Sequence, residues 1–427
     1  MLDLRRIREE PELVVEGLAR RGADFGPVVR EIVALDEVRR DGLTRVNDLK
    51  ARRNTASKEI GARKREGEDA SELIEGMRVL GDEITGLDRE IAGAEERIEA
   101  LLLELPNVPL DEVPEGGEEA NQVVSSWGTP ASFSFTPLAH WELGERLGVL
   151  DLPRGARISG SGFPVLRGAG ARLQRGLINF FLDRHVQEND YVELRVPYLV
   201  TRETLTGTGQ LPKFADESYQ TERDDLWLIP TAEVPVTNLH RDEILEAEGL
   251  PVRYTAYSPC FRREAGAAGK DTRGLLRVHQ FDKVELVRYE TPERSRQALE
   301  ELTREAEILL EALGLHYRRL LLAGGDLGFS SAMTYDLEVW APGVGQWLEV
   351  SSCSVFTDFQ ARRANLRYRP APGEKPRHLH TLNGSALALP RVVAALLETH
   401  QREDGSVSLP EVLHPYLGVA RLEPPAG

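Results

Sequence analysis

Apolar residues recur in steps of three and four, without a miss, between residues 77 and 105. They are Met77, Leu80, Ile84, Leu87, Ile91, Ala94, Ile98, Leu101 and Leu105. This spacing places one apolar seam along an α-helix, the pattern of a coiled coil. A less regular seam precedes it and is interrupted by Arg39, Gly42 and Arg53. Its apolar residues are Phe25, Val28, Ile32, Leu35, Val46, Leu49, Ala56 and Ile60. The charged segment 61–70 separates the seams, so we expect an antiparallel coiled-coil hairpin with its turn there.

The two halves of this hairpin carry opposite charge. Residues 28–65 hold 11 Lys/Arg against 6 Asp/Glu, whereas residues 66–105 hold 3 against 13. A basic first arm, ending in Arg63, Lys64 and Arg65, suits a phosphate backbone. Taken alone, the hairpin is explained more commonly by charges that only set helix pairing and solubility.

Length and composition leave room for two or three domains in the 427 residues. The N-terminal sequence lacks the apolar core of a signal peptide, and no apolar run reaches the ~18 residues of a membrane span. Cys260 and Cys353 are too few for a disulfide framework, so we expect free thiols in a reducing cytoplasm. A net charge of -17 argues only superficially against nucleic acid, because the distribution of charge matters more.

Residues 106–121 are rich in Pro, Gly and acidic residues and are expected to link a helical domain, 1–105, to a catalytic domain, 122–427. In the second domain we expect helices at 136–147, 168–188 and 293–313, and strands at 191–200, 227–229, 335–340 and 346–350. The loops between strands are too short for helical crossovers, which predicts an α+β fold with a largely antiparallel sheet. Pro197 inside a strand favours an edge or a subunit interface.

Chemistry-bearing residues gather in the segment 257–285, which is predicted to be strand, loop and strand. Arg262 ends the first strand and Glu264 follows it. Phe281 and Glu285 lie four residues apart on the second strand and therefore share a sheet face. One arginine, two carboxylates and an aromatic ring suit a nucleotide and a small zwitterion. Taken alone, the segment is explained equally well as an exposed charged hairpin.

Two later segments add to this set. Glu349 and Ser352 offer hard oxygen ligands of the kind that Mg²⁺ accepts. Residues 382–391 pass from a strand into a helix whose first turns carry Arg391. Two arginines, a carboxylate for Mg²⁺ and a stacking Phe are what an ATP site without a phosphate loop needs. His378 and His380 have no further ligands at metal-binding spacing, so no zinc is expected.

The sheet bearing FRREAG at 261–266, the Gly-Ser to Pro-Arg helix entry at 384–391 and the Thr-Ala-Glu segment at 231–233 together resemble class II aminoacyl-tRNA synthetases. With the N-terminal hairpin, the whole chain is similar to the bacterial seryl-tRNA synthetase family. The resemblance implies a class II sheet flanked by helices. It also implies activation of L-serine with ATP to seryl-adenylate and pyrophosphate, followed by transfer to tRNA(Ser), and to tRNA(Sec) as well.

The resemblance also implies site residues. The ATP site would comprise Arg262, Arg263, Glu264, Val278, Phe281, Glu349, Val350, Ser351, Ser352 and Arg391, with Arg262 and Arg391 as catalytic residues and Mg²⁺ on Glu349 and Ser352. Serine would bind Thr231, Ala232, Glu233, Arg262, Glu285, Asn383 and Ser385, with Glu233 at the ammonium and Glu285 at the hydroxyl. The tRNA would contact Arg63, Lys64, Arg65, Lys270 and Arg273. Residues 168–200 would form a homodimer interface.

Two other functions fit parts of the sequence. An enzyme of the same fold that loads an amino acid onto a carrier protein would share the site, but such relatives lack the long basic-armed hairpin. A catalytically inactive scaffold would use the coiled coil for assembly, but Arg262, Glu264, Glu349 and Arg391 are all present.

Overall fold

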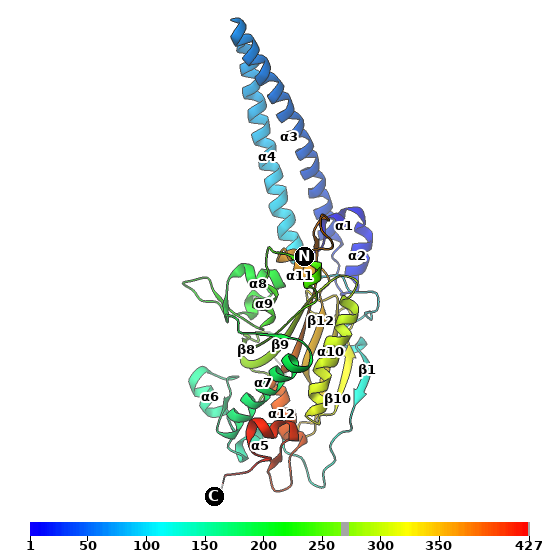
Figure 1. Cartoon of the computed structure of the whole chain (residues 1–427), viewed down its shortest axis with the longest axis vertical. Helices are drawn as coiled ribbons and strands as arrows, with labels where there is room; N and C mark the ends of the chain where they lie inside the picture. The colour runs from blue at the N-terminus through cyan, green and yellow to red at the C-terminus, as the bar shows by residue number, and fades with distance from the viewer. Residues whose placement is uncertain (266–272, 426–427) are drawn as a thin grey trace. The chain divides into compact units, whose positions relative to one another are not determined.

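The computed structural model describes residues 1–265 and 273–425. The chain divides into two compact units (Figure 1). The helical unit comprises residues 2–19 and 23–106, and the larger unit comprises residue 1, residues 20–22 and residues 107–427. Within the described part of the chain, no helix combines the length and the apolar character needed to cross a membrane.

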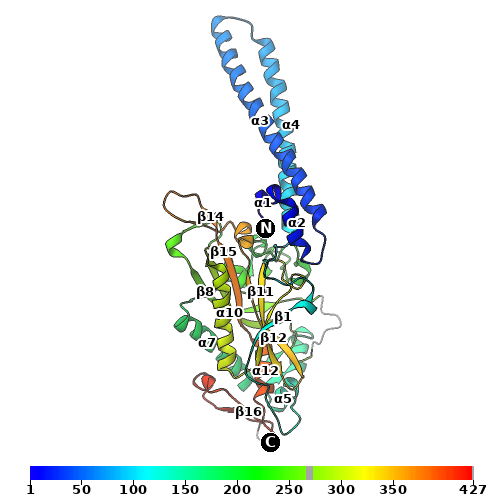
Figure 2. The ribbon, with the colours of Figure 1, turned by 90° about the vertical axis from the view of Figure 1, so that its right-hand side faces the viewer.

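The helical unit consists of α1 (Leu4–Glu9), α2 (Pro11–Ala19), α3 (Gly26–Glu66) and α4 (Ser71–Glu104). Helices α3 and α4 run side by side as an antiparallel pair (Figures 1 and 2). The predicted seam of α4 is buried from Ile84 to Leu101. On α3 the buried residue near the start is Val29 rather than the predicted Val28.

The interruptions of the first seam have physical explanations. Asp36 is fully buried on α3 and accepts from Arg39, at 2.7 Å, and from Arg40, at 3.1 Å, so the predicted break at Arg39 is an ion cluster. Gly42 faces α4 so closely that a Cβ there would lie 2.9 Å from Ile91. The seam therefore continues through both positions with polar and small residues in place of large apolar ones.

The turn of the hairpin is shorter than the predicted segment 61–70. Helix α3 continues through Gly61 to Glu66, and Gly67, with a φ of 76°, ends it by donating its N–H to the Arg63 carbonyl. Glycine inside a helix costs only about 1 kcal/mol, so Gly61 by itself does not end the helix. Arg63, Lys64 and Arg65 therefore form the last turn of α3, where cations complement the helix dipole.

The larger unit is built on an eight-stranded sheet in the order β1-β10-β11-β12-β15-β9-β8-β4. These strands are β1 (Gln122–Trp127), β4 (Val192–Leu194), β8 (Val252–Phe261), β9 (Gln280–Glu290), β10 (Tyr317–Leu321), β11 (Met333–Ala341), β12 (Gln346–Val355) and β15 (His380–Ala388). All neighbours pair antiparallel except β4 and β8, which are parallel. The predicted α+β fold with a largely antiparallel sheet is confirmed.

The remaining elements surround this sheet. The helices are α5 (His140–Arg146), α6 (Leu152–Ser159), α7 (Ala169–Glu188), α8 (Arg202–Thr208), α9 (Glu233–Thr237), α10 (Ser295–Ala312), α11 (Phe359–Arg363), α12 (Leu389–Thr399) and α13 (His414–Leu417). The short strands are β2 (Leu150–Asp151), β3 (Val165–Leu166), β5 (Leu199–Val200), β6 (Trp227–Leu228), β7 (Ile244–Glu246), β13 (Arg367–Arg369), β14 (Arg377–His378), β16 (Val407–Ser408) and β17 (Arg421–Leu422).

Two expected elements differ from the structure. The helix predicted at 136–147 begins only at His140, because Gln401 binds both the N–H and the carbonyl of Leu138 and holds that residue outside the helix. The strand predicted at 191–200 is divided into β4 and β5, which belong to different sheets. Pro197 lies between them and cannot donate a ladder hydrogen bond.

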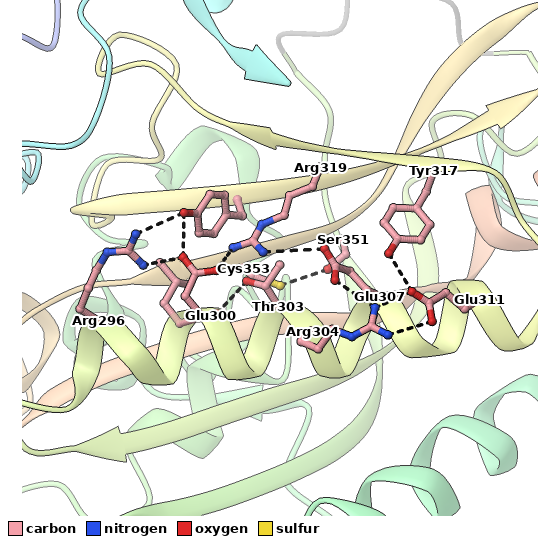
Figure 3. A network of polar contacts seen from close by, with 12 residues as sticks. Arg296, Glu300, Thr303, Arg304, Glu307, Glu311, Tyr317, Arg319, Ser351 and Cys353 are labelled. Atoms are coloured by element: carbon pink, nitrogen blue, oxygen red, sulfur yellow. Dashed lines mark hydrogen bonds and ion pairs between the residues drawn. The ribbon is translucent and has the colours of Figure 1, made fainter. Parts of the chain in front are cut away.

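Helix α10 packs on one face of the sheet through a polar network as well as an apolar core (Figure 3). The Arg319 guanidinium lies 3.6 Å from the centre of the Tyr335 ring and forms ion pairs with Glu300 and Glu307 of α10. A side chain at Gly384 would collide with Leu302 of α10. Because neighbouring residues of a strand face opposite sides, Asn383 and Ser385 of β15 point to the face away from α10.

Candidate active site

A cavity of about 640 Å³ opens on the sheet face opposite α10, over β8, β9, β12 and β15. Most of the predicted site residues line it, although they come from five separate stretches of the chain. They are Thr231, Glu233, Arg262, Glu264, Val278, Phe281, Glu349, Val350, Ser352, Asn383, Ser385 and Arg391.

Strand β9 brings alternate residues to this face. Phe281 and Lys283 line the cavity, and Glu285 follows in the same alternation but is fully buried beneath its wall. Ser385 of β15 lies directly opposite Glu285 in the strand register. Strand β9 therefore carries one aromatic ring, one cation and one carboxylate at alternate positions on one face.

A bulge in β12 explains how Glu349 and Ser352 reach the same cavity. Residues three apart on a regular strand point to opposite faces. Ser351 pairs with Leu337 of β11, whereas Glu349 already pairs with Glu338, so Val350 is an extra residue without a partner. The bulge reverses the alternation. As a result, Glu349, Val350 and Ser352 all line the cavity.

A carboxylate cluster, consisting of Glu233, Glu285, Thr231, Lys283 and Asn383, lies at one end of the cavity. The Asn383 amide donates to both carboxylates, at 2.9 Å to Glu233 and 3.1 Å to Glu285. The Thr231 hydroxyl donates to Glu285 at 3.0 Å, and Lys283 forms an ion pair with the same carboxylate. Two acidic groups are thus held next to each other in a buried position.

Burial and proximity change the acidity of these two carboxyls. Burial, followed by the charge of Glu285, raises the pKa of Glu233 to about 7. Burial also raises the pKa of Glu285, and the nearby Lys283 ammonium opposes that rise. A ligand that brings a positive charge to Glu233 would favour its ionised form.

Lys283, a member of this cluster, and Gln360, which binds it, were not predicted. The Gln360 amide donates to Glu233 at 2.7 Å, and its oxygen accepts from Thr381 at 2.7 Å. Lys283 lies two residues from both Phe281 and Glu285, so the strand alternation that united those two residues also points to it. Gln360 follows Glu233 by 127 residues, and no local pattern connects them.

Arginines gather at the other end of the cavity. The Arg262 guanidinium carbon lies 5.1 Å from the centre of the Phe281 ring. Arg391, near the start of α12, donates to the carbonyls of Leu276, at 3.0 Å, and Glu349, at 2.9 Å. Glu264 forms an ion pair with Arg277. Its backbone φ is 51°, an uncommon conformation for a residue with a side chain. This end offers positive charge beside a flat ring.

Several predicted site residues lie outside the cavity lining. Arg263 donates to the Asp216 carbonyl at 3.0 Å. Ala232 is fully buried, and the Ser351 hydroxyl donates to the Ser385 carbonyl at 2.6 Å, which ties β12 to β15. The Arg273 guanidinium lies 4.5 Å from the centre of the Trp141 ring. Lys270 is outside the described residues.

The described residues include no group of three or more His, Cys, Asp or Glu side chains arranged to hold a metal. The oxygen donors that face the cavity from β12 are the Glu349 carboxylate, about half exposed, and the Ser352 hydroxyl. This pair suits a hard cation that keeps water and phosphate oxygens among its ligands better than it suits a fully protein-bound metal.

Known families match both parts of the chain. Residues 1–109 match the model of the seryl-tRNA synthetase N-terminal domain, and residues 214–400 match the tRNA synthetase class II core domain (G, H, P, S and T). The serine--tRNA ligase of Gemmatimonas aurantiaca is 58% identical over 424 residues, which cover 99% of this chain and 100% of the relative.

Solved structures agree with these matches. The seryl-tRNA synthetase of Pyrococcus horikoshii, complexed with ATP, is similar with a TM-score of 0.95 and 40% identity over 100% of both chains. The cytoplasmic serine-tRNA ligase of Naegleria fowleri, in complex with AMP, has a TM-score of 0.89 and 28% identity over 100% of this chain and 99% of that chain. The resemblance predicted from the motifs is therefore confirmed, and the chain belongs to the seryl-tRNA synthetase family of class II aminoacyl-tRNA synthetases.

Proposed function

We propose that this chain activates L-serine with ATP, forming seryl-adenylate and pyrophosphate, and then transfers serine to the 3′ end of tRNA(Ser), and of tRNA(Sec) as well. The observation that carries this proposal is that one cavity is lined by the carboxylate cluster, by Arg262 beside the Phe281 ring, and by Arg391. An amino acid at the carboxylate cluster and a nucleotide beside Phe281 would meet at Arg262. The alternative, loading of a carrier protein, is not favoured by the relatives.

Serine would bind at the carboxylate cluster. Glu233 would accept from the substrate ammonium, with Thr231, Asn383 and Ser385 around it, and Glu285 would accept from the substrate hydroxyl. Alanine would leave the buried Glu285 carboxylate without that partner, and an unmade hydrogen bond to a charged group costs more than a missing methylene. Threonine would have to be excluded by space alone, which is a weaker filter.

ATP would bind at the arginine end. Phe281 and Val278 would contact the adenine ring and Glu264 its amino group, while Arg262 and Arg391 would contact the phosphates. The Glu264 carboxylate already pairs with Arg277, so nucleotide binding would exchange or share that partner.

The chemistry would need orientation and charge stabilisation more than proton transfer. The serine carboxylate forms a bond to the α-phosphorus, the bond from that phosphorus to the bridging oxygen breaks, and pyrophosphate leaves. The 3′-terminal tRNA hydroxyl then attacks the seryl carbonyl and AMP leaves. Arg262 and Arg391 would stabilise the charge that develops on phosphorus and on pyrophosphate.

Glu349 and Ser352 would hold Mg²⁺, because the bulge at Val350 turns both oxygen donors to the cavity. When bound, the ion would supply positive charge to the phosphates. The chain's own contribution is to keep the Glu349 carboxylate oriented, which Arg391 supports by contacting it at 3.4 Å and its carbonyl at 2.9 Å.

The partners and the domains follow from the same family. Residues 1–105 would be the tRNA-binding domain, with Arg63, Lys64 and Arg65 contacting the tRNA, and residues 122–427 the aminoacylation domain. Segment 168–200 would form a homodimer interface, which is supported by Val192 and Leu199, 57% and 46% exposed. Two buried free cysteines support a reducing cytoplasmic location.

The test is amino-acid-dependent ATP–pyrophosphate exchange over a panel of amino acids, followed by tRNA charging. We expect exchange with serine alone and charging of tRNA(Ser). Arg391→Ala should abolish exchange, whereas Arg402→Ala, which removes an exposed arginine that binds Ser408, should not. The proposal fails if serine supports no exchange. Exchange without charging of any tRNA would favour the carrier-protein ligase.

A further inference from the structure

A buried histidine and glutamate lie next to the cavity and have no assigned role. The side chains of His140, the first residue of α5, and Glu398, near the end of α12, are both 0% exposed. One Glu398 oxygen accepts from the His140 backbone N–H at 2.9 Å and contacts His140 Nδ1 at 2.7 Å. The other accepts from the N–H groups of Gly343, at 2.8 Å, and Val344, at 3.1 Å.

These partners determine the tautomer of His140. The Nε2 atom accepts the backbone N–H of Leu275 at 3.0 Å, so it carries a lone pair rather than a proton. The Nδ1 atom faces a carboxylate oxygen and therefore carries the proton. The imidazole is thus a neutral bridge that donates to Glu398 and accepts from Leu275.

Leu275 belongs to the segment 273–276, which leads into β9 and includes two cavity-lining residues, Leu275 and Leu276. Every residue of this segment has a contact with α5 or α12. Arg273 lies over the Trp141 ring, and a Cβ on Gly274, whose φ is +67°, would lie 2.3 Å from His140 Nε2. The Leu276 carbonyl accepts from Arg391 Nε at 3.0 Å.

Helix α12 consequently holds this segment at two points, directly through Arg391 and indirectly through Glu398 and His140. Two buried polar side chains are a costly way to fill space, because burying a polar group is unfavourable unless each hydrogen bond is made. An apolar pair would pack the same volume but would leave the Leu275 N–H without an acceptor. The polar pair therefore serves to orient a backbone that forms part of the cavity wall.

We infer that His140, held by Glu398, is a positioning residue for the nucleotide end of the cavity. It fixes segment 273–276, and through the Leu276 carbonyl it fixes the orientation of Arg391. The inference rests on the proposed function for its kinetic consequence but not for its structural one. The carboxylate cluster has no hydrogen bond to this segment among the described residues, so serine binding should depend on His140 much less than ATP binding does.

Two substitutions separate the two bonds of the imidazole. His140→Asn places an amide near the position of Nδ1, so it keeps a donor for Glu398 and loses the acceptor for Leu275. His140→Gln reaches the position of Nε2, so it keeps an acceptor for Leu275 and loses the donor for Glu398. We expect His140→Asn to raise the KM for ATP in pyrophosphate exchange about tenfold, the effect of one buried hydrogen bond, with the KM for serine changed less than about twofold. His140→Gln should retain a KM for ATP closer to that of the parent chain.

Amide hydrogen exchange of the peptide containing residues 273–279 provides a second readout that needs no activity. We expect faster exchange in this peptide for His140→Asn than for the parent chain and His140→Gln. The inference would be overturned if His140→Asn and His140→Gln lost the same stability while the amide hydrogen exchange of this peptide and the KM for ATP stayed unchanged. If the parent chain shows no serine-dependent activity, the proposed function fails. The amide hydrogen exchange of the 273–279 peptide still decides the role of His140.

Discussion

Replacing Lys283 with methionine should destabilise the carboxylate cluster in a pH-dependent manner. The Lys283 side chain is 6% exposed and forms an ion pair with Glu285, whose side chain is 0% exposed. Methionine keeps most of the length and removes the charge, so it leaves Glu285 with Thr231 and Asn383 as its remaining partners. Breaking a buried pair by removing one partner costs about 3–5 kcal/mol.

Glu285 can avoid an unpaired buried charge by taking up a proton, and this sets the upper limit of the cost. A pH of 7.5 lies roughly three units above the ordinary pKa of a glutamate carboxyl, and protonation costs about 1.36 kcal/mol per unit, or about 4 kcal/mol. Burial already raises the pKa of Glu285, and removing Lys283 raises it further. The folded variant then binds a proton that the unfolded chain does not, so its stability increases as the pH falls. The deficit relative to the parent chain should shrink by up to about 2.7 kcal/mol between pH 7.5 and pH 5.5.

The measurement is the free energy of unfolding by denaturant at both pH values, together with serine-dependent pyrophosphate exchange. The acidic limb of kcat/KM for serine should move to higher pH in Lys283→Met, because a protonated Glu285 lacks the negative charge that strengthens its hydrogen bond with the substrate hydroxyl. Lys375→Met, at an exposed position, is the matched control. Lys283→Met combined with Glu285→Gln should recover stability without recovering activity. An equal deficit at both pH values, with no recovery in the double variant, would refute the reasoning.

Three further predictions concern separate parts of the molecule. Because the pKa of Glu233 is raised to about 7 and the substrate ammonium binds the ionised form, the KM for serine should rise about tenfold per pH unit below 7; a KM that stays flat down to pH 5.5 would contradict this. Reversing the three cations at 63–65 to Glu should lower tRNA charging about tenfold at low salt and spare serine activation. The matched control replaces Arg78, Arg89 and Arg97 of α4 with Glu, and this change should have less effect on tRNA charging. Arg319→Ala should lower the free energy of unfolding by about 2 kcal/mol, because Glu300 and Glu307 lose an arginine partner while Arg304 still pairs with Glu307. A KM for serine that also changed would indicate a wider disturbance.

Elements whose partners lie nearby in the chain, or whose periodicity is regular, could be predicted from the sequence. The seam of α4 repeats without interruption, and it is buried from Ile84 to Leu101 as expected. The hairpin of β8 and β9 follows from two alternating segments around one loop. The antiparallel sheet follows from the short connections between strands.

Features that depend on register or on distant contacts could not be predicted. The sequence around Val350 does not predict the bulge that brings Glu349 and Ser352 to one face. His140 acts through Glu398, 258 residues away, and through Leu275, 135 residues away. In sequence, His140 is only the second polar position in a short amphipathic segment, and only the tertiary fold shows that both of its ring nitrogens have partners.

The balance of charge around the carboxylate cluster indicates what kind of ligand fits there. Glu233 and Glu285 are two acidic groups in a buried position, and Lys283 offsets one of them. Burial, followed by the charge of Glu285, raises the pKa of Glu233, and a ligand ammonium would lower that pKa again. A ligand with an ammonium alone would leave Arg262 without an anion, whereas a carboxylate on the same ligand would supply one. The site is therefore complementary to an amino acid zwitterion, and the buried Glu285 acceptor, supported by Lys283, favours an amino acid whose side chain ends in a hydroxyl.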